Sequence, residues 1–267
     1  MANYERKWRE NRLKTKNYLS GHFSYKTDLG LARISNDDRV IGLNNSKGNV
    51  LLVVCDGMGG AKKGDFAATI AITTVQESFK NRKRGFLNRG AARYWLASAI
   101  RKANRRIYNE ASKNEEMYKG MGTTITALLI VRDYYVVAQV GDSRCYTISP
   151  RNNQFVQITE DQTYVAYLYR TKAITEEEMA THPKRHVLMN ALGIYPSLEL
   201  DIKTGPYLNE PFLLCTDGLY NNVSKQDIEL IFRGDDTVEQ KISTLIALAN
   251  ANGGSDNIGI VLWESDN

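Results

Sequence analysis

Two apolar segments of strand length end in Asp-Gly pairs that the chain does not use as ordinary turns. Val50–Cys55 leads into the pair at Asp56, and residues 212–216 lead into the pair at Asp217. An Asp-Gly pair normally makes a tight β-hairpin, in which a second strand follows at once. A loop and then a helical pattern follow each pair here, so neither pair is a two-residue hairpin. We therefore expect both carboxylates to end neighbouring central strands and to point into one crevice.

Further acidic residues stand at other strand ends. Asp142 follows the strand predicted over residues 134–140, Asp256 precedes the strand predicted over residues 258–263, and Asp37 lies in an early Asn-Asp-Asp segment. Several carboxylates in one crevice repel one another unless a cation lies between them. Ligands that are all oxygen, without His or Cys, select Mg²⁺ or Mn²⁺ rather than Zn²⁺. The sequence therefore predicts a site for divalent metal ions.

Two neighbouring residues extend this predicted site. Gly57 has no side chain to block the approach of its backbone, so its carbonyl can serve as a further oxygen ligand. Arg33 lies four residues before Asp37 and offers a two-pronged guanidinium group for a phosphate. Two divalent ions about 4 Å apart can hold one water and lower its pKa. The pattern therefore indicates an enzyme in which such a water attacks an electrophile.

Helical and strand patterns come in blocks along the chain. Residues 64–80 and 91–111 carry apolar side chains at helical spacing, and we expect them to pack as an antiparallel helix pair. Four runs separated by turn signals predict a meander of antiparallel hairpins, over residues 123–131, 134–140, 144–148 and 154–158. Capping patterns predict three later helix starts, at Thr175, Ser224 and Thr237. Such blocks favour an α+β layered sandwich over a parallel sheet.

Composition limits the classes of partner and the number of domains. The chain has 267 residues, and 35 Lys and Arg against 30 Asp and Glu leave a formal net charge of +5. This charge allows acidic or phosphorylated partners but is too scattered to predict nucleic-acid binding. No apolar run is long enough for a membrane span, and the three cysteines lie in apolar segments as core residues, so we expect a reduced, cytoplasmic protein. Residues 1–20 are predicted to be a flexible or loosely docked terminus, and residues 21–267 one domain.

Taken together, these motifs resemble the metal-dependent serine/threonine protein phosphatases of the type 2C (PPM) family, in their bacterial form. The resemblance extends in order through nearly the whole chain. Eight blocks carry it, at residues 27–38, 54–60, 122–124, 141–144, 159–161, 191–193, 215–219 and 255–258.

The resemblance implies a four-layer α-β-β-α sandwich of two antiparallel sheets flanked by helix pairs. It also implies hydrolysis of phosphoserine and phosphothreonine on proteins by a water that two metal ions activate, without a covalent intermediate. The metal is Mg²⁺ or Mn²⁺, with a weaker third ion in bacterial members. The implied partners are phosphoproteins, in opposition to a serine/threonine kinase, with the chain acting as a monomer and without nucleic acid or membrane.

The resemblance also assigns roles to individual residues. Asp56 bridges both ions, and Asp217 and Asp256 hold the first. The second ion is served by the Gly57 carbonyl and by Asp37. The resemblance further matches Asp142 to the third ion and Arg33 to the phosphate group.

The chain departs from the family pattern at several positions. Asp37 stands where the family usually has Glu, which leaves open whether it binds its metal directly or through a water. Met58 replaces a His that acts as general acid in many eukaryotic members, so a bound water or solvent would protonate the leaving group. Gln162 replaces another frequent His. Asn190, in the flap over residues 185–193, stands where the family often has Arg, which predicts an altered substrate preference.

Other interpretations compete with this one. Cys145 and Arg151 fit the Cys-x5-Arg signature of cysteine phosphatases, but that chemistry needs a loop of backbone N–H groups leading into a helix, whereas this segment has the pattern of a strand followed by Pro. A phosphoprotein-binding module without turnover is a second alternative, supported by the Asp37 change. A metal phosphoesterase acting on small molecules is a third.

Overall fold

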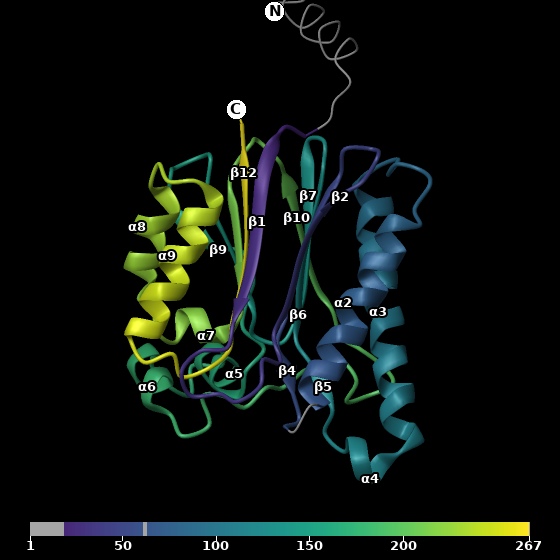
Figure 1. Cartoon of the computed structure of the whole chain (residues 1–267), viewed down its shortest axis with the longest axis vertical. Helices are drawn as coiled ribbons and strands as arrows, with labels where there is room; N and C mark the ends of the chain where they lie inside the picture. The colour runs from purple at the N-terminus through teal and green to yellow at the C-terminus, as the bar shows by residue number, and fades with distance from the viewer. Residues whose placement is uncertain (1–18, 61–62, 267) are drawn as a thin grey trace, which may run out of the picture.

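The central strands are apolar at every position because layers cover both of their faces. In the computed structural model, which describes residues 19–60 and 63–266, every side chain of β3 (Val50–Cys55) and of β6 (Ile125–Val131) is buried. Figure 1 shows the cause: two sheets stack face to face, and a pair of helices covers the outer face of each. The predicted four-layer α-β-β-α sandwich is confirmed.

Each large sheet has five antiparallel strands. The first sheet has the order β10 (Asp201–Pro206), β7 (Tyr134–Val140), β6, β3 and β2 (Arg39–Asn44). The second has the order β1 (Gly21–Asp28), β12 (Ile258–Ser265), β11 (Phe212–Cys215), β8 (Arg144–Ile148) and β9 (Phe155–Gln157). A short third sheet pairs β4 (Gly57–Met58) with β5 (Gly122–Thr123).

The helices lie outside the sheets. The first sheet is covered by α2 (Lys63–Lys80) and α3 (Arg89–Lys113), and the second by α8 (Lys225–Arg233) and α9 (Val238–Ala251) (Figure 1). Shorter helices lie in the connections: α4 (Glu115–Tyr118), α5 (Tyr164–Arg170), α6 (Glu176–Thr181) and α7 (Asp217–Tyr220). The predicted helix caps are confirmed, with capping boxes at Thr175 and Thr237 and a Ser224 hydroxyl that accepts from the Asp227 amide.

Three apolar clusters fill the three spaces between the four layers. One packs α2 and α3 on the first sheet, with Phe79 and Leu96 fully buried, and another packs α8 and α9 on the second. The third lies between the sheets, where the buried Trp263 donates its ring N–H to the Tyr207 hydroxyl at 2.8 Å. Burial on both sides of both sheets fixes the strand ends in place, and the strand ends carry the acidic residues.

The predicted meander is wrong at one connection. Strands β6 and β7 pair as a hairpin, but β8 leaves that sheet and pairs with β9 and β11 in the other. The crossing occurs at Gly141, whose φ of 96° is readily adopted only by glycine, and at Asp142. The predicted run 123–131 is also interrupted, because the Thr124 backbone N–H donates to the Asp56 carbonyl at 2.8 Å instead of to a neighbouring strand.

Most of the terminus predicted to be flexible or loosely docked lies outside the described residues. Of its last two residues, Leu19 packs against the cluster between the sheets, and Ser20 accepts from the Asp266 amide at 3.2 Å. Among the described residues, no helix combines the length and apolar character needed to cross a bilayer.

Candidate metal centre

The acidic residues named above meet at one end of the sandwich. Asp56 directly follows β3, Asp217 opens α7 after β11, and Asp256 lies just before β12. The segments that carry them lie together at the lower end of Figure 1, near β4 and α7. In β2, Arg39 pairs with Cys55 of β3, which places Asp38 beside Asp56.

Glycine permits the closest approach between these segments. A Cβ atom on Gly218 would lie 1.9 Å from the Asn257 carbonyl oxygen. The turn that carries Asp217 can therefore pack against the segment that carries Asp256 only while residue 218 has no side chain. The neighbouring Thr216 hydroxyl donates to Asp38 at 2.7 Å and accepts from the Gly259 amide at 2.7 Å, which ties β11 to both β12 and the Asp38 segment.

The pKa values show that these carboxyl groups act on one another. Burial, and then the charges of four other aspartates of the cluster, raise the pKa of Asp56 well above its usual range. Burial and the charge of Asp256 raise the pKa of Asp217 to about 6, although Arg33 and a hydrogen bond to the Asp56 carboxyl lower it. Burial and the charge of Asp217 raise the pKa of Asp142 to about 7. The cluster therefore holds more negative charge than its protein neighbours neutralise.

Asp37 and the Gly57 carbonyl face a common point. A Cβ atom added to Gly64 would lie 2.6 Å from the Gly57 carbonyl oxygen and 2.7 Å from Asp37 Oδ2. The other carboxylate oxygen, Oδ1, is buried and has no hydrogen-bond partner among the described residues. The Asp37 amide donates to the Asn257 side-chain oxygen at 2.8 Å, which fixes the backbone. A carbonyl and a carboxylate close together, with the second carboxylate oxygen buried and without a donor among the described residues, suit a hard cation.

Arg33 stands at the mouth of this cluster. Its guanidinium Nη2 donates to Asp256 Oδ2 at 2.7 Å, and its side chain is 55% exposed. The hydrogen bond to Asp256 and the nearby charges of Asp217 and Asp56 raise its pKa. The structure therefore brings Arg33 to the predicted carboxylates, with part of the guanidinium still open to solvent.

Sequence reasoning missed the groups that support Asp142. The Arg144 guanidinium donates to both Asp161 oxygens, at 3.2 Å or less, and stacks over the Tyr220 ring at 3.5 Å. The Tyr220 hydroxyl in turn donates to the Asp142 carbonyl at 3.2 Å. Arg144 and Asp161 belong to motifs quoted above, but nothing in their spacing indicates that they pair.

The donor set fits a divalent cation by its chemistry. All candidate ligands are oxygens, they carry excess negative charge, and one buried oxygen has no donor. No three His, Cys, Asp or Glu side chains converge around one point within the described part of the chain. The carboxylates therefore interact electrostatically as one cluster without converging on a single point.

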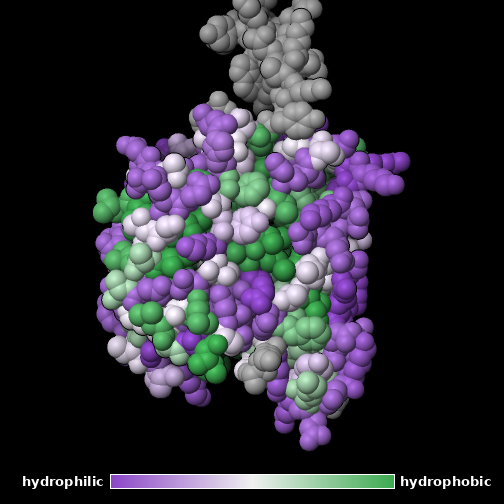
Figure 2. Space-filling view, viewed as in Figure 1, coloured by the Kyte–Doolittle hydropathy of each residue, from purple (hydrophilic) through white to green (hydrophobic). Residues whose placement is uncertain are grey.

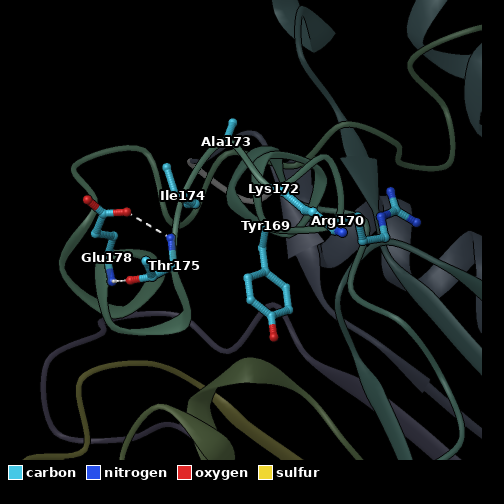
Figure 3. A pocket seen from close by; sticks show the side chains of 7 residues that line it. All are labelled: Tyr169, Arg170, Lys172, Ala173, Ile174, Thr175 and Glu178. Atoms are coloured by element: carbon cyan, nitrogen blue, oxygen red, sulfur yellow. Dashed lines mark hydrogen bonds between the residues drawn. The ribbon is translucent and has the colours of Figure 1, made fainter.

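The flap packs against the loop that holds Asp142. The Gln162 side-chain oxygen accepts from the Gly141 amide at 3.0 Å and from the Asn190 side chain at 2.9 Å. A separate hollow of about 530 Å³ is lined by residues of α5, α6 and the loop between them. Figure 3 shows the Tyr169 ring and the Thr175 capping box among its lining residues. His186 lies exposed in the same flap.

The cysteine alternative finds no support in the structure. Cys145 is fully buried in β8, and burial raises the pKa of its thiol, so the reactive thiolate is disfavoured. Neither a phosphate-binding loop nor a helix follows it, because Arg144–Ile148 is a strand.

Comparison with known proteins gives one consistent family. The family model for protein phosphatase 2C matches residues 32–257. The serine/threonine phosphatase stp of Listeria monocytogenes is 34% identical over 246 residues, which cover 92% of this chain and 96% of that protein. The phosphatase PhpP of Streptococcus pneumoniae is 32% identical over 244 residues, which cover 90% of this chain and 95% of that protein.

Solved structures agree with this result. The serine/threonine phosphatase Stp1 from Staphylococcus aureus has a TM-score of 0.86 and 32% identity, covering 94% of this chain and 98% of that one. The catalytic domain of PstP in complex with two manganese ions has a TM-score of 0.79 and 29% identity, covering 92% and 98%. The chain therefore belongs to the protein phosphatase 2C family of metal-dependent phosphatases.

Proposed function

We propose that this chain removes phosphate from phosphoserine and phosphothreonine in proteins at the carboxylate end of its sandwich. The observation that carries the proposal is the cluster itself. Burial and the charges of neighbouring aspartates raise the pKa values of four buried carboxyl groups, Asp38, Asp56, Asp142 and Asp217, and Arg33 beside them leaves part of its guanidinium open to solvent. A structural cluster would pair these charges within the fold, whereas a metal-dependent site leaves them for the ions.

The residues would divide between two principal ions. Asp217 and Asp256 would hold the first, Asp37 and the Gly57 carbonyl would hold the second, and Asp56 would serve both. Asp142 serves a weaker third ion, supported by its buried position at the sheet crossing. Divalent ions bound there supply Lewis acidity and a water of lowered pKa. Mg²⁺ and Mn²⁺ both suit these oxygens.

Arg33 binds the phosphate of the substrate. Its guanidinium already reaches one carboxylate of the cluster and keeps other N–H groups free for the two-pronged contact that phosphate oxygens accept. Met58 has no proton to give, so this chain protonates the leaving alkoxide from water. Asp37 has a shorter side chain than Glu, so it would reach its ion either directly or through a water.

The cellular role follows from the substrate class. A phosphatase of this kind reverses the work of a serine/threonine kinase on phosphoproteins. We place it in the cytoplasm as a monomer, as its core thiols and its single sandwich suggest.

Turnover in defined metals tests the proposal. The purified chain is assayed with a phosphothreonine peptide, p-nitrophenyl phosphate and a nucleotide, in Mn²⁺, in Mg²⁺ and in EDTA. We expect metal-dependent release of phosphate, fastest relative to KM on the peptide. A folded protein that binds the phosphopeptide without turnover would support the binding-module alternative, and preference for the nucleotide would support the small-molecule alternative.

A further inference from the structure

A basic site lies at the end of the sandwich opposite the metal centre. The β2–β3 turn, the α2–α3 loop and the β6–β7 turn meet there, at the upper right of Figure 1, and they enclose a hollow of about 370 Å³. Four cationic side chains line the hollow: Lys47, Lys83, Arg84 and Arg132. Asp133 is the acidic residue of these three loops. Figure 2 shows hydrophilic side chains crowding this edge of the molecule.

The helix pair and loop next to the hollow have a larger net positive charge than the whole chain has. Residues 63–113, which hold α2, α3 and their loop, carry twelve Lys and Arg against three Asp and Glu. Each of the three acids already has an ion-pair partner: Asp65 with Arg39, Glu77 with Arg106 and Glu110 with Lys113. Among the described residues of the three loops, four cations of the hollow stand against the single acid Asp133, so the hollow has a net positive field.

Two buried groups at this end lack a hydrogen-bond acceptor. Arg82 stacks over the Phe86 ring at 4.0 Å and donates to the Gly85 carbonyl at 3.1 Å, yet its Nε is buried without a partner among the described residues. The Tyr134 hydroxyl is likewise buried and unpartnered within that set, with the charge of Asp133 nearby as well as those of Arg132 and Arg89. Neither group lines the hollow, so the case for an anion with several acceptor oxygens, such as a phosphate group, rests on the four cationic side chains that do.

The hollow is separate from the metal centre. Strand β3 runs from beside Asn49, which lines the hollow, to Asp56, and six residues of strand span about 20 Å. A phosphate in the hollow therefore contacts none of the candidate metal ligands and is not hydrolysed there. Leu87, 94% exposed in the same α2–α3 loop, offers an apolar contact for a residue next to that phosphate.

We propose that the hollow lined by Lys47, Lys83, Arg84 and Arg132 is a non-catalytic docking site for a phosphorylated segment of a protein. The occupant is the phosphoprotein that this chain meets through its proposed function, on which this inference rests. A second phosphate on such a protein binds at the hollow, and the protein is held while the carboxylate end acts elsewhere on it. Because at least 20 Å, or about six extended residues, separate the two ends, a short peptide with one phosphate cannot bridge them.

Binding in EDTA isolates the hollow. Without divalent ions the carboxylate end is negative and repels phosphate, so bound phosphopeptide reports the basic end. A labelled phosphothreonine peptide is titrated by anisotropy into the full chain, into K83A/R84A/R132N and into R101A/K102A/R105A. Asn is chosen at position 132 because its φ of 52° lies in the left-handed region, which Asn tolerates. The second triple removes the same charge from exposed positions of α3.

We expect K83A/R84A/R132N, the hollow triple, to lower the affinity for the phosphothreonine peptide about ten-fold or more, since it removes charge-assisted hydrogen bonds. We expect R101A/K102A/R105A, the α3 triple, to change this affinity less than about two-fold. The matching unphosphorylated and Glu-substituted peptides should bind at least about ten-fold more weakly. An equal loss of affinity in both triples would show that diffuse positive charge binds the peptide and would refute a specific site. No loss of affinity in the hollow triple would also refute the site. Equal binding of the Glu peptide would overturn phosphate recognition.

Two further measurements distinguish this inference from membrane binding and from failure of the proposed function. Sedimentation with phosphatidylglycerol vesicles asks whether the basic end binds a membrane; vesicle binding without phosphopeptide binding would refute the docking site. Turnover of p-nitrophenyl phosphate in Mn²⁺ should be the same in the wild-type chain and in both triples. If the wild-type chain shows no turnover, the proposed function fails while the EDTA binding result still stands or falls alone.

Discussion

Replacing Asp142 by Asn tests the electrostatics of the metal centre through stability. Asp142 is 8% exposed, and burial together with the charge of Asp217 raises its pKa from 3.8 to about 7. A carboxyl group whose pKa is higher in the folded chain binds its proton more tightly there than in the unfolded chain. The metal-free fold is therefore most stable in acid and loses stability as pH rises toward 7. Asn has the same shape and no charge to bury.

The magnitude follows from the shift. One unit of pKa corresponds to about 1.4 kcal/mol. Between pH 5 and pH 8 the folded-state ionisation of Asp142 costs about two such units, or about 3 kcal/mol of unfolding free energy. Asp142→Asn removes this cost. In EDTA, the unfolding free energy of the variant should therefore rise by about 3 kcal/mol relative to that of the wild-type chain between pH 5 and pH 8.

Urea unfolding in EDTA at pH 5, 6, 7 and 8 measures the difference directly. With saturating Mn²⁺ the sign should reverse, because the ion then stabilises a charged Asp142 and has less to bind in the variant. A stability difference that stays constant with pH, or that favours the wild-type chain more at pH 8 in EDTA, would refute the assignment of Asp142 to a crowded, uncompensated cluster.

Four other substitutions probe the site. Asp217→Asn should lower turnover by more than about a hundredfold while circular dichroism stays unchanged; normal turnover would rule out a metal ligand there. Arg33→Ala should raise KM about ten-fold with little change in kcat, by loss of a charged contact to phosphate, and an unchanged KM would count against phosphate binding. Gly64→Ala should raise the Mn²⁺ concentration needed for half-maximal activity, because its Cβ would lie within 2.7 Å of two candidate ligand oxygens; an unchanged titration would contradict that geometry. Cys145→Ser should keep specific activity within about two-fold, as a buried thiol outside the site predicts, and loss of activity in folded protein would reopen the cysteine mechanism.

Buried central strands could be predicted from the sequence, whereas three of the four edge strands of the two large sheets could not. The runs around β3, β6, β7, β11 and β12 are continuous and apolar because both faces are covered, and their positions agree with the predictions. The three missed strands, β1, β2 and β10, are all sheet edges. Their side chains are mostly half-buried or exposed, so neither a continuous apolar run nor a clean alternation marks them.

The wrong meander has a local cause that pattern reading does not contain. The turn signal at Gly141 is real, but a turn between two strands does not say whether they share a sheet. Here the Ser143 hydroxyl bonds the Thr124 hydroxyl at 2.8 Å, and the Ser143 carbonyl accepts from Thr126 at 2.6 Å. These buried bonds direct the chain across to the second sheet, and Asp142 is placed in the crevice by that crossing.

The acidic residues were predictable because they break a local rule. An Asp-Gly pair with no partner strand needs another reason to follow a buried strand, and the structure gives that reason by bringing Asp56 and Asp217 within one electrostatic cluster. Residues whose type is ordinary for their position in a strand or loop gave no such signal. Arg144 occupies an ordinary strand position, and only the folded chain shows that it pairs with Asp161.

Stability and chemistry draw on the same side chains in this fold. The apolar layers fix the positions of the strand ends, which would otherwise move apart because their aspartates repel one another. Packing of the buried core therefore offsets this repulsion. Arg33 and Arg144 offset part of this repulsion, one at the mouth through Asp256 and one behind through Asp161. Because their compensation is partial, we expect the cluster to have affinity for a cation, and we expect a fully paired version of the same cluster to be more stable and inactive.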